Sequence, residues 1–197
     1  MIHIQNTIQK YKMKVNPDKW VGALIKPTET FKAEKVNADL VDAMINIGVG
    51  GVIGGIILWI GIFLFGEEIG KTLGLGVSKM PIEIVIFLPL SLVLYLLIIS
   101  GIYFIFAKIF GGKGTYTMQT YLLSLLYAPV MAISVVILLI PPISSLLSIL
   151  ISFYVLYPLT IALKETHKYG IIRAVLTWMV PVLIVTALIV LILISFV

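Results

Sequence analysis

Five long stretches without a charged side chain constrain this chain more than any other feature of its sequence. Each stretch holds 20 to 24 residues and lacks Asp, Glu, Lys, Arg and His. An α-helix rises about 1.5 Å per residue, so about 20 residues cross a hydrocarbon core that is about 30 Å thick. The sequence therefore predicts an all-α, polytopic integral membrane protein with five transmembrane helices. The expected spans are 43–65, 84–107, 121–140, 142–163 and 174–197.

Composition agrees with this assignment and excludes a soluble monomer. Hydrophobic residues make up 60% of the chain and charged residues 12%, whereas a soluble domain is about half apolar and about a quarter charged. The spans divide the chain into a cytosolic tail with short interfacial helices, residues 1–42, and a five-helix membrane domain, residues 43–197. The tail lacks the apolar core of a cleavable signal peptide, so the first span is expected to act as an uncleaved signal anchor.

The distribution of positive charge predicts how the chain is oriented. Twelve of the 14 Lys and Arg residues lie on the side of the membrane that holds the N-terminus. By the positive-inside rule that side is the cytoplasm, which gives an N-in, C-out topology. Because orientation explains the net charge of +5, no nucleic-acid partner is expected. The 13 lysines against one arginine, the many isoleucines and the absence of cysteine favour a prokaryotic plasma membrane.

The tail carries two short candidate helices. Asn16 and Pro17 indicate a turn before the first helix, and Pro27 ends that helix and precedes the second. Trp20 and Phe31 lie on the apolar faces of these amphipathic segments. Two placements stay open for them: the headgroup layer of the inner leaflet, or packing on the cytosolic ends of the chain's own spans.

The first span is rich in glycine. Gly50 and Gly54 form one G-x-x-x-G pair, and Gly51 and Gly55 form a second. This spacing lets another helix approach closely in lipid. Whether that helix is internal or belongs to a second subunit stays open. If a single close partner covers one of the two adjacent faces, the other is available for a homo-oligomer or another membrane protein.

Three spans each contain a proline at a similar depth. Pro129, Pro158 and Pro181 are expected in the inner half of the membrane, where each removes one helix hydrogen bond. The freed carbonyl groups need protein or water as partners, so a polar pocket at this level is one interpretation. Ordinary tolerance of proline in membrane spans is the other. A passage at this level would involve Ser148, Ser152, Tyr154, Tyr127 and Thr177.

The spans carry no group suited to acid–base or metal chemistry. Both histidines, His3 and His167, lie outside the expected spans, and no acidic residue lies within any of them. Cysteine is absent, and so is an H-E-x-x-H zinc motif. In the run 111–115 Gly114 follows Lys113, which departs from a phosphate-binding loop, so a flexible turn is expected. We therefore expect no enzyme, no catalytic residue, no cofactor and no metal site.

Three segments of the chain follow a recognisable pattern: ALKETHKYGIIRAV at 162–175, Trp20 followed by KPTETF at 26–31, and FGGKG at 110–114 followed by Tyr127-Ala128-Pro129. In these segments the chain resembles the Yip (Ypt/Rab-interacting protein) domain family. Their order, together with five spans and a cytosolic N-terminus, extends the resemblance over about residues 18–195. The short N-terminal tail makes the chain similar to a prokaryotic-type member.

The resemblance implies a non-enzymatic membrane protein that serves as a scaffold or adaptor in membrane organisation or trafficking. Eukaryotic relatives act at the endoplasmic reticulum and Golgi and associate with prenylated Rab GTPases, so a small GTPase is a partner by family analogy only. The alternative is a transporter, channel or lipid-moving protein with its passage in spans three to five. The contact surface is expected on the cytosolic face, where the cations either attract anionic membrane lipids or serve topology alone. The candidate contact residues are Trp20, Pro27, Phe31, Lys108, Lys113, Lys164, Glu165, His167, Lys168 and Arg173.

Overall fold

The computed structural model describes residues 15–73 and 82–195, and every regular element in these two ranges is a helix. Three short elements come first: α2 (Pro17–Ile25), α3 (Pro27–Glu34) and the 3-10 turn η1 (Lys35–Asn37). Five long helices follow: α4 (Leu40–Leu73), α5 (Ile84–Ile109), α6 (Tyr116–Leu138), α7 (Pro141–His167) and α8 (Ile171–Ser195).

The five long helices are each long and apolar enough to cross a membrane, which confirms the expected architecture. Each of them extends beyond its expected span at one end or both. Helix α6 begins at Tyr116 rather than at 121, and α7 ends at His167 rather than at 163. The extra turns carry polar side chains such as Gln119, which is hydrogen-bonded inside the bundle. Residues 196–197 of the expected fifth span lie outside the described residues.

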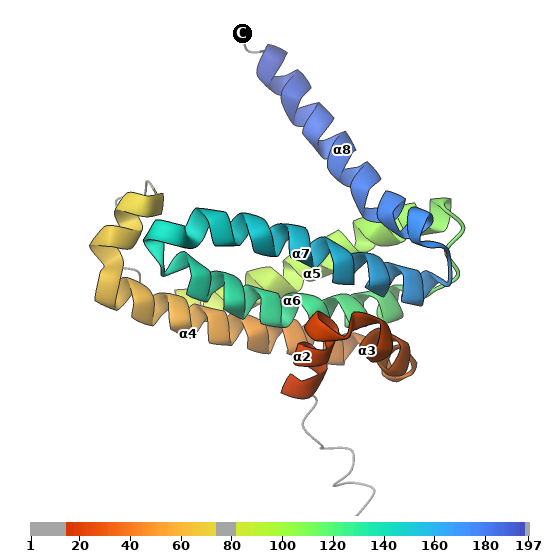
Figure 1. Ribbon diagram of the computed structural model, residues 1–197, viewed down its shortest axis with the longest axis horizontal. Coiled ribbons are helices and arrows are strands. Elements are labelled where there is room, and N and C mark those ends of the chain that lie inside the picture. The colour runs from red at the N-terminus through yellow and green to blue at the C-terminus, as the bar shows by residue number, and fades with distance from the viewer. Residues whose placement is uncertain (1–14, 74–81, 196–197) are drawn as a thin grey trace, which may run out of the picture.

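The two short helices at the N-terminus begin at the two prolines singled out in the sequence, Pro17 and Pro27. The Asn16 side chain accepts a hydrogen bond of 2.9 Å from the Asp18 N–H, and Pro17 follows at the first helical position. Helix α2 ends at Ile25, and α3 begins at Pro27 after the single residue Lys26. Figure 1 shows these helices beside the bundle, where α2 contacts α6 and α3 contacts α7.

Helices α4 to α7 run side by side, with α6 as the central member (Figure 1). Helix α6 contacts α4, α5 and α7. Its buried side chains include an unbroken run from Gln119 to Leu126, followed by Ala128 and Pro129. Because membrane helices associate mainly through close van der Waals packing, this central helix holds the bundle together.

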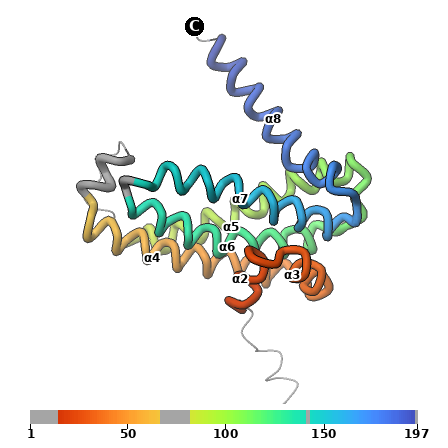
Figure 2. The backbone as a smooth tube through the Cα atoms, in the orientation of Figure 1, coloured from red at the N-terminus to blue at the C-terminus, as the bar shows by residue number. Residues whose placement is uncertain are grey.

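Helix α8 packs on the bundle only through its first turns. Ala174, Thr177 and Pro181 are buried, and this part of the helix contacts α5 and α7. From residue 182 to 195 every side chain is exposed. Figures 1 and 2 show this second half of the helix diverging from the other four. Its apolar side chains therefore face the surroundings on all sides.

One glycine face of α4 packs against α6. A Cβ atom at Gly50 would lie 2.7 Å from the carbonyl oxygen of Ala128, which is closer than real contacts allow. A Cβ atom at Gly54 would lie 3.5 Å from the Val135 side chain, an ordinary contact distance. The backbones of α4 and α6 are therefore closest at Gly50.

The second glycine face of α4 packs against α5. A Cβ atom at Gly51 would lie 2.5 Å from the Cα atom of Pro89, and one at Gly55 would lie 3.0 Å from the Cα atom of Val85. Both glycine pairs thus pack within the chain. The expectation that one of these two faces stays free for a second subunit is wrong, because two different helices of the same chain cover them.

The prolines lie inside helices that continue through them. Pro129, Pro158 and Pro181 are buried in α6, α7 and α8. A fourth proline, Pro89, lies within α5 and was not among the prolines expected to matter. Its Cα atom is the one that approaches Gly51. Pro89 is thus a packing residue at the contact between α4 and α5. The polar pocket at the level of Pro129, Pro158 and Pro181 stays a prediction.

Candidate functional site

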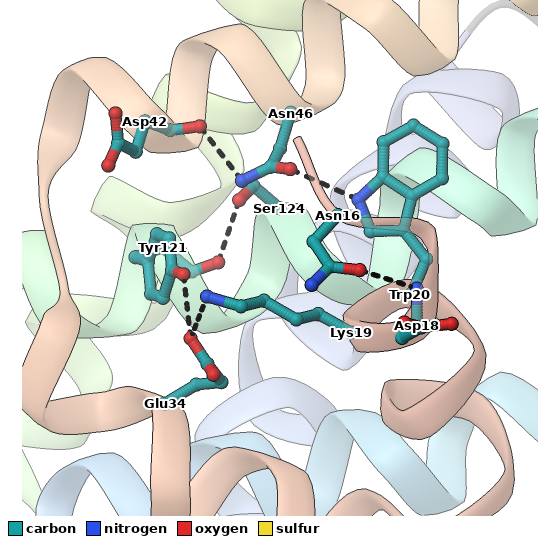
Figure 3. Close-up of polar contacts among 9 residues, drawn as sticks. All are labelled: Asn16, Asp18, Lys19, Trp20, Glu34, Asp42, Asn46, Tyr121 and Ser124. Atoms are coloured by element: carbon teal, nitrogen blue, oxygen red, sulfur yellow. Dashed lines mark hydrogen bonds and ion pairs between the residues drawn. The ribbon is translucent and has the colours of Figure 1, made fainter. Parts of the chain in front are cut away.

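Polar side chains gather at one end of the bundle, where α4, α6 and α8 begin and α5 and α7 end. We call this the basal end. On one side of it the indole Nε1 of Trp20 donates a 3.1 Å hydrogen bond to Asn46 Oδ1 (Figure 3). The Asn46 amide in turn donates to the Asp42 carbonyl at 2.9 Å. Trp20 is 8% exposed and Asn46 is 1% exposed, so this bond joins α2 to α4 away from solvent.

An ion pair and a tyrosine join α2, α3 and α6. Figure 3 shows the Lys19 amine and the Tyr121 hydroxyl pointing at the same carboxylate oxygen of Glu34. The Lys19 Nζ lies 2.6 Å from Glu34 Oε2, and the Tyr121 hydroxyl donates to that oxygen at 3.0 Å. Because charged hydrogen bonds are shorter and stronger than neutral ones, this three-way contact fixes α3 on α6.

Two further contacts fasten the N-terminal segment to α7. Lys35 Nζ lies 2.9 Å from Glu165 Oε2, an ion pair across 130 residues of sequence. The Tyr154 hydroxyl donates to the Leu24 carbonyl. The segment 17–37 is therefore docked on three helices of the bundle: α4, α6 and α7.

Docking decides between the two placements left open for the aromatic residues of this segment. Phe31 is 0% exposed, and Trp20 and Pro27 are also buried. The structure thus favours packing on the chain's own helices over contact with headgroups for these three residues. Their burial leaves α3 positions such as Thr28 and Lys32 as the exposed part of the segment.

The centre of the basal end is a buried histidine. His167 is 0% exposed, and its Nδ1 accepts a 3.3 Å hydrogen bond from the Gly114 N–H. An acceptor nitrogen carries no proton, so the ring is neutral and its hydrogen lies on Nε2. That nitrogen donates a 2.7 Å bond to Gln119 Oε1. Both ring nitrogens are thus occupied, and His167 has no lone pair for a metal or a substrate proton.

The hydrogen bonds continue from Gln119 into the bundle. The Gln119 amide donates to the Ser100 carbonyl at 2.6 Å and to the Ser100 hydroxyl at 3.1 Å. The Ser100 and Thr120 hydroxyls lie 2.7 Å apart, and Thr120 donates to the Tyr116 carbonyl. Because the Thr120 hydroxyl donates its hydrogen to that carbonyl, Ser100 is the donor in the hydrogen bond between Ser100 and Thr120. This series of hydrogen bonds joins α5, α6 and α7, and each of its side chains has a partner.

The loop between α5 and α6 is held tightly against the end of α7. Lys108 Nζ donates to the Gly114 carbonyl at 2.8 Å, and the Lys113 N–H donates to the His167 carbonyl at 3.1 Å. A Cβ atom at Gly112 would lie 2.6 Å from His167 Nδ1. Glycine is needed here because the loop backbone lies directly on the imidazole. The expected flexible turn is wrong, since the loop is hydrogen-bonded at several points.

Tyr169 joins the α7–α8 loop to both helices. Its ring stacks on the His167 ring with centroids 5.4 Å apart, and its hydroxyl lies 2.7 Å from the Thr177 hydroxyl. Thr177 donates to the Arg173 carbonyl, so Tyr169 is the donor between the two. Burial raises the pKa of Tyr169 to about 12, and the Thr177 contact opposes that rise only in part. The phenol therefore stays protonated at neutral pH.

The comparison with known families agrees with this arrangement. The Yip1 domain matches residues 21–194, which include α3, the five long helices except the last residue of α8, and the α5–α6 and α7–α8 loops. The chain belongs to the Yip1 family. Members of the Yip1 family are multi-span membrane proteins that are generally non-enzymatic. No curated protein and no solved structure matches the chain.

In this Yip1-domain protein the expected contact residues have different surroundings. Lys113, Lys168 and Arg173 are exposed at the basal end, and Lys164 is half-buried. Lys108 is bonded to loop carbonyls. Glu165 pairs with Lys35, and His167 is fully buried, so these two serve internal contacts. Only part of the expected contact surface is therefore available to a partner.

Several residues of the basal clusters were not predicted as site residues. They are polar residues inside or next to the apolar spans, where burial without a partner would be costly. That cost is the sequence signal that could have found them. They are Glu34, Asn46, Ser100, Gln119, Thr120 and Tyr121.

The described part of the Yip1 chain holds no candidate metal centre. Within residues 15–73 and 82–195, no three His, Asp or Glu side chains gather closely enough to hold an ion. The carboxylates of Glu34 and Glu165 each face a lysine instead. The polar groups at the basal end thus fasten helices and loops to one another.

Proposed function

We propose that this Yip1-domain protein is a non-enzymatic scaffold or adaptor that organises partner proteins at the cytosolic face of its membrane. One observation carries the proposal: the polar side chains of the basal end bond to one another. The ring nitrogens of His167 are both occupied, and the hydroxyls of Ser100, Thr120 and Tyr169 each donate within the protein. Such a buried cluster fixes the helices and loops of the basal end to one another and offers no reactive group.

The proposal includes an orientation with the basal end in the cytoplasm and α8 ending outside. The exposed cations Lys113, Lys168 and Arg173 at this end agree with the positive-inside rule. The membrane we propose is a prokaryotic plasma membrane. A small GTPase comes into consideration as a partner through family analogy, while a second copy of the chain or another membrane protein is also compatible with the exposed surface.

The partner surface that we propose is the exposed side of α3, with the adjacent end of α2. Thr28, Glu29 and Lys32 are exposed on α3, and Ile25 is 70% exposed on α2. The contacts of Trp20 and Glu34 hold these helices in place, so the surface is presented without an ordering cost upon binding. A mixed polar and apolar surface of this kind is typical of protein–protein contacts.

Photo-cross-linking in the native membrane tests this function. A photoreactive amino acid at Lys32 is expected to give discrete protein adducts, because this position faces a partner. The same amino acid at Ile98, which is 55% exposed on α5, is the lipid-facing control and is expected to give none. Lipid adducts alone at both positions would contradict the scaffold proposal.

No observation favours the alternative function, a transporter, channel or lipid-moving protein with its passage in spans three to five. The Ser152 hydroxyl donates to the Ser148 carbonyl of its own helix, and Tyr154 donates to Leu24. Thr177 is 0% exposed and bonded to Tyr169. Three of the five hydroxyls expected to face a common passage, those of Ser152, Tyr154 and Thr177, are used in separate contacts, so we advance no transport function.

A further inference from the structure

We propose that Lys113, Lys168 and Arg173 form a binding site for the phosphate headgroup of an anionic phospholipid at the basal end. The site lies apart from the α3 surface and does not depend on the scaffold function. It uses one residue from the α5–α6 loop, one from the α7–α8 loop and one from the first turn of α8.

Backbone contacts bring these three cations to one place. The Lys113 N–H donates to the carbonyl of His167, the residue that precedes Lys168. The Arg173 guanidinium lies over the loop that holds Lys113, because its Nη1 would be 3.5 Å from a Cβ atom at Gly111. Two loops that are more than 50 residues apart in sequence thus share one cationic surface.

The three cations have no acidic partner within the described residues. All three side chains are exposed, and none makes an ion pair in residues 15–73 or 82–195. The nearest carboxylate along the chain, Glu165, is already paired with Lys35. The positive charge of the loops is therefore available to an external anion.

Two of these cations occupy positions that are unfavourable for them. Arg173 lies in the first turn of α8, where the helix dipole disfavours a positive charge, and that turn contains no acidic residue. Lys168 has a φ of 55° at the end of α7, a left-handed conformation that is costly for a residue with a Cβ atom. Glycine would suit the second position better. A bound anion offsets the unfavourable charge of Arg173 at the start of α8.

The depth of the site identifies the anion as a lipid headgroup. Lys113, Lys168 and Arg173 lie where the apolar segments of α5 and α7 end and that of α8 begins. This is the level at which lipid phosphates meet the protein surface. Each cation near an anionic surface adds to the attraction, so three cations in one place bind a headgroup more tightly than scattered lysines do.

Native mass spectrometry with defined lipids tests the site. The purified full chain is titrated with phosphatidylglycerol or with phosphatidylcholine of the same acyl chains. The wild type is expected to retain phosphatidylglycerol more strongly. The variant Lys113→Gln/Arg173→Gln is expected to lose about 30-fold in its affinity for that lipid, because two attractive charges are removed.

The control removes the same charge elsewhere. Lys26→Gln/Lys32→Gln alters two exposed lysines on the α2–α3 segment and is expected to change the affinity by less than about twofold, since these lysines lie outside the cluster. Melting temperatures check that both variants fold. An equal loss in both variants, or no loss in either, would overturn the site. Displacement of the lipid by inorganic phosphate would also overturn it, because the ligand would then be a free anion.

Discussion

Gly51→Ala is expected to destabilise the protein strongly although it adds a single methyl group. The new Cβ atom would lie 2.5 Å from the Cα atom of Pro89, so the backbones of α4 and α5 must move apart. Gly50→Ala is expected to act in the same way against the Ala128 carbonyl on α6. Overpacking against backbone costs about 2 kcal/mol or more, and thermal unfolding in detergent or bicelles measures it as a lower Tm.

Two other glycines of the same helix provide the matched controls. A Cβ atom at Gly48 would lie 3.9 Å from its nearest neighbour on Val93, and one at Gly54 would lie 3.5 Å from Val135. Alanine is expected to be tolerated at both positions, and its better helix propensity contributes up to about 1 kcal/mol. Equal melting temperatures for Gly51→Ala and Gly48→Ala would contradict the packing described here. A change of oligomer size without a change of Tm would place the contact between subunits.

His167→Ala is expected to have the second large effect on stability. The substitution leaves the Gly114 N–H and the Gln119 Oε1 without their buried partner. An unsatisfied buried polar group costs about 1–3 kcal/mol, so the two together lower the free energy of unfolding by roughly 2–6 kcal/mol. Chemical or thermal unfolding of the purified protein measures this loss.

A double-mutant cycle separates the hydrogen bond from the loss of the ring. Gln119→Leu removes the partner of His167 Nε2, and the double variant removes both sides of the bond. The double variant is expected to lose less stability than the summed losses of the two single variants. In the double variant neither His167 Nε2 nor Gln119 Oε1 remains to be left unpaired. Additive losses within about 0.5 kcal/mol would show that His167 and Gln119 do not act as a pair.

The helices of this fold follow from local properties of the sequence. Each span is a charge-free run of sufficient length, and that length alone predicts a crossing helix. The short helices α2 and α3 follow from Asn16, Pro17 and Pro27, which act on their immediate neighbours. Such features require no knowledge of what lies across the bundle, so the sequence was sufficient to predict them.

The contacts between helices could not be predicted in the same way. The glycine pairs of α4 indicate close approach, but nothing in their spacing says that Gly50 meets α6 and Gly51 meets α5. Lys35 and Glu165 are 130 residues apart, and the ion pair between them exists only after the bundle has formed. Pairings over such distances depend on the packing of the whole chain.

The loop between α5 and α6 shows a second limit of prediction from sequence. The glycines at 111, 112 and 114 are equally compatible with a flexible turn and with a backbone pressed against a neighbour. The structure places the His167 ring on this backbone, and the ring occupies the space that side chains at Gly112 would need. A run of glycines shows only that no side chain is present at these positions. The group that fills the space beside them comes from a distant part of the sequence.

The N-terminal segment 17–37 is docked on the bundle at the basal end. Because the chain contains no cysteine, the variant Lys35→Cys/Glu165→Cys can be cross-linked in native membranes with a short bismaleimide. We expect one dominant product that joins the peptides holding positions 35 and 165 within a single chain, identified by mass spectrometry after proteolysis. The control Lys35→Cys/Ile98→Cys is expected to give none. Labelling of both cysteines without a bridge, or bridges only between chains, would contradict the account.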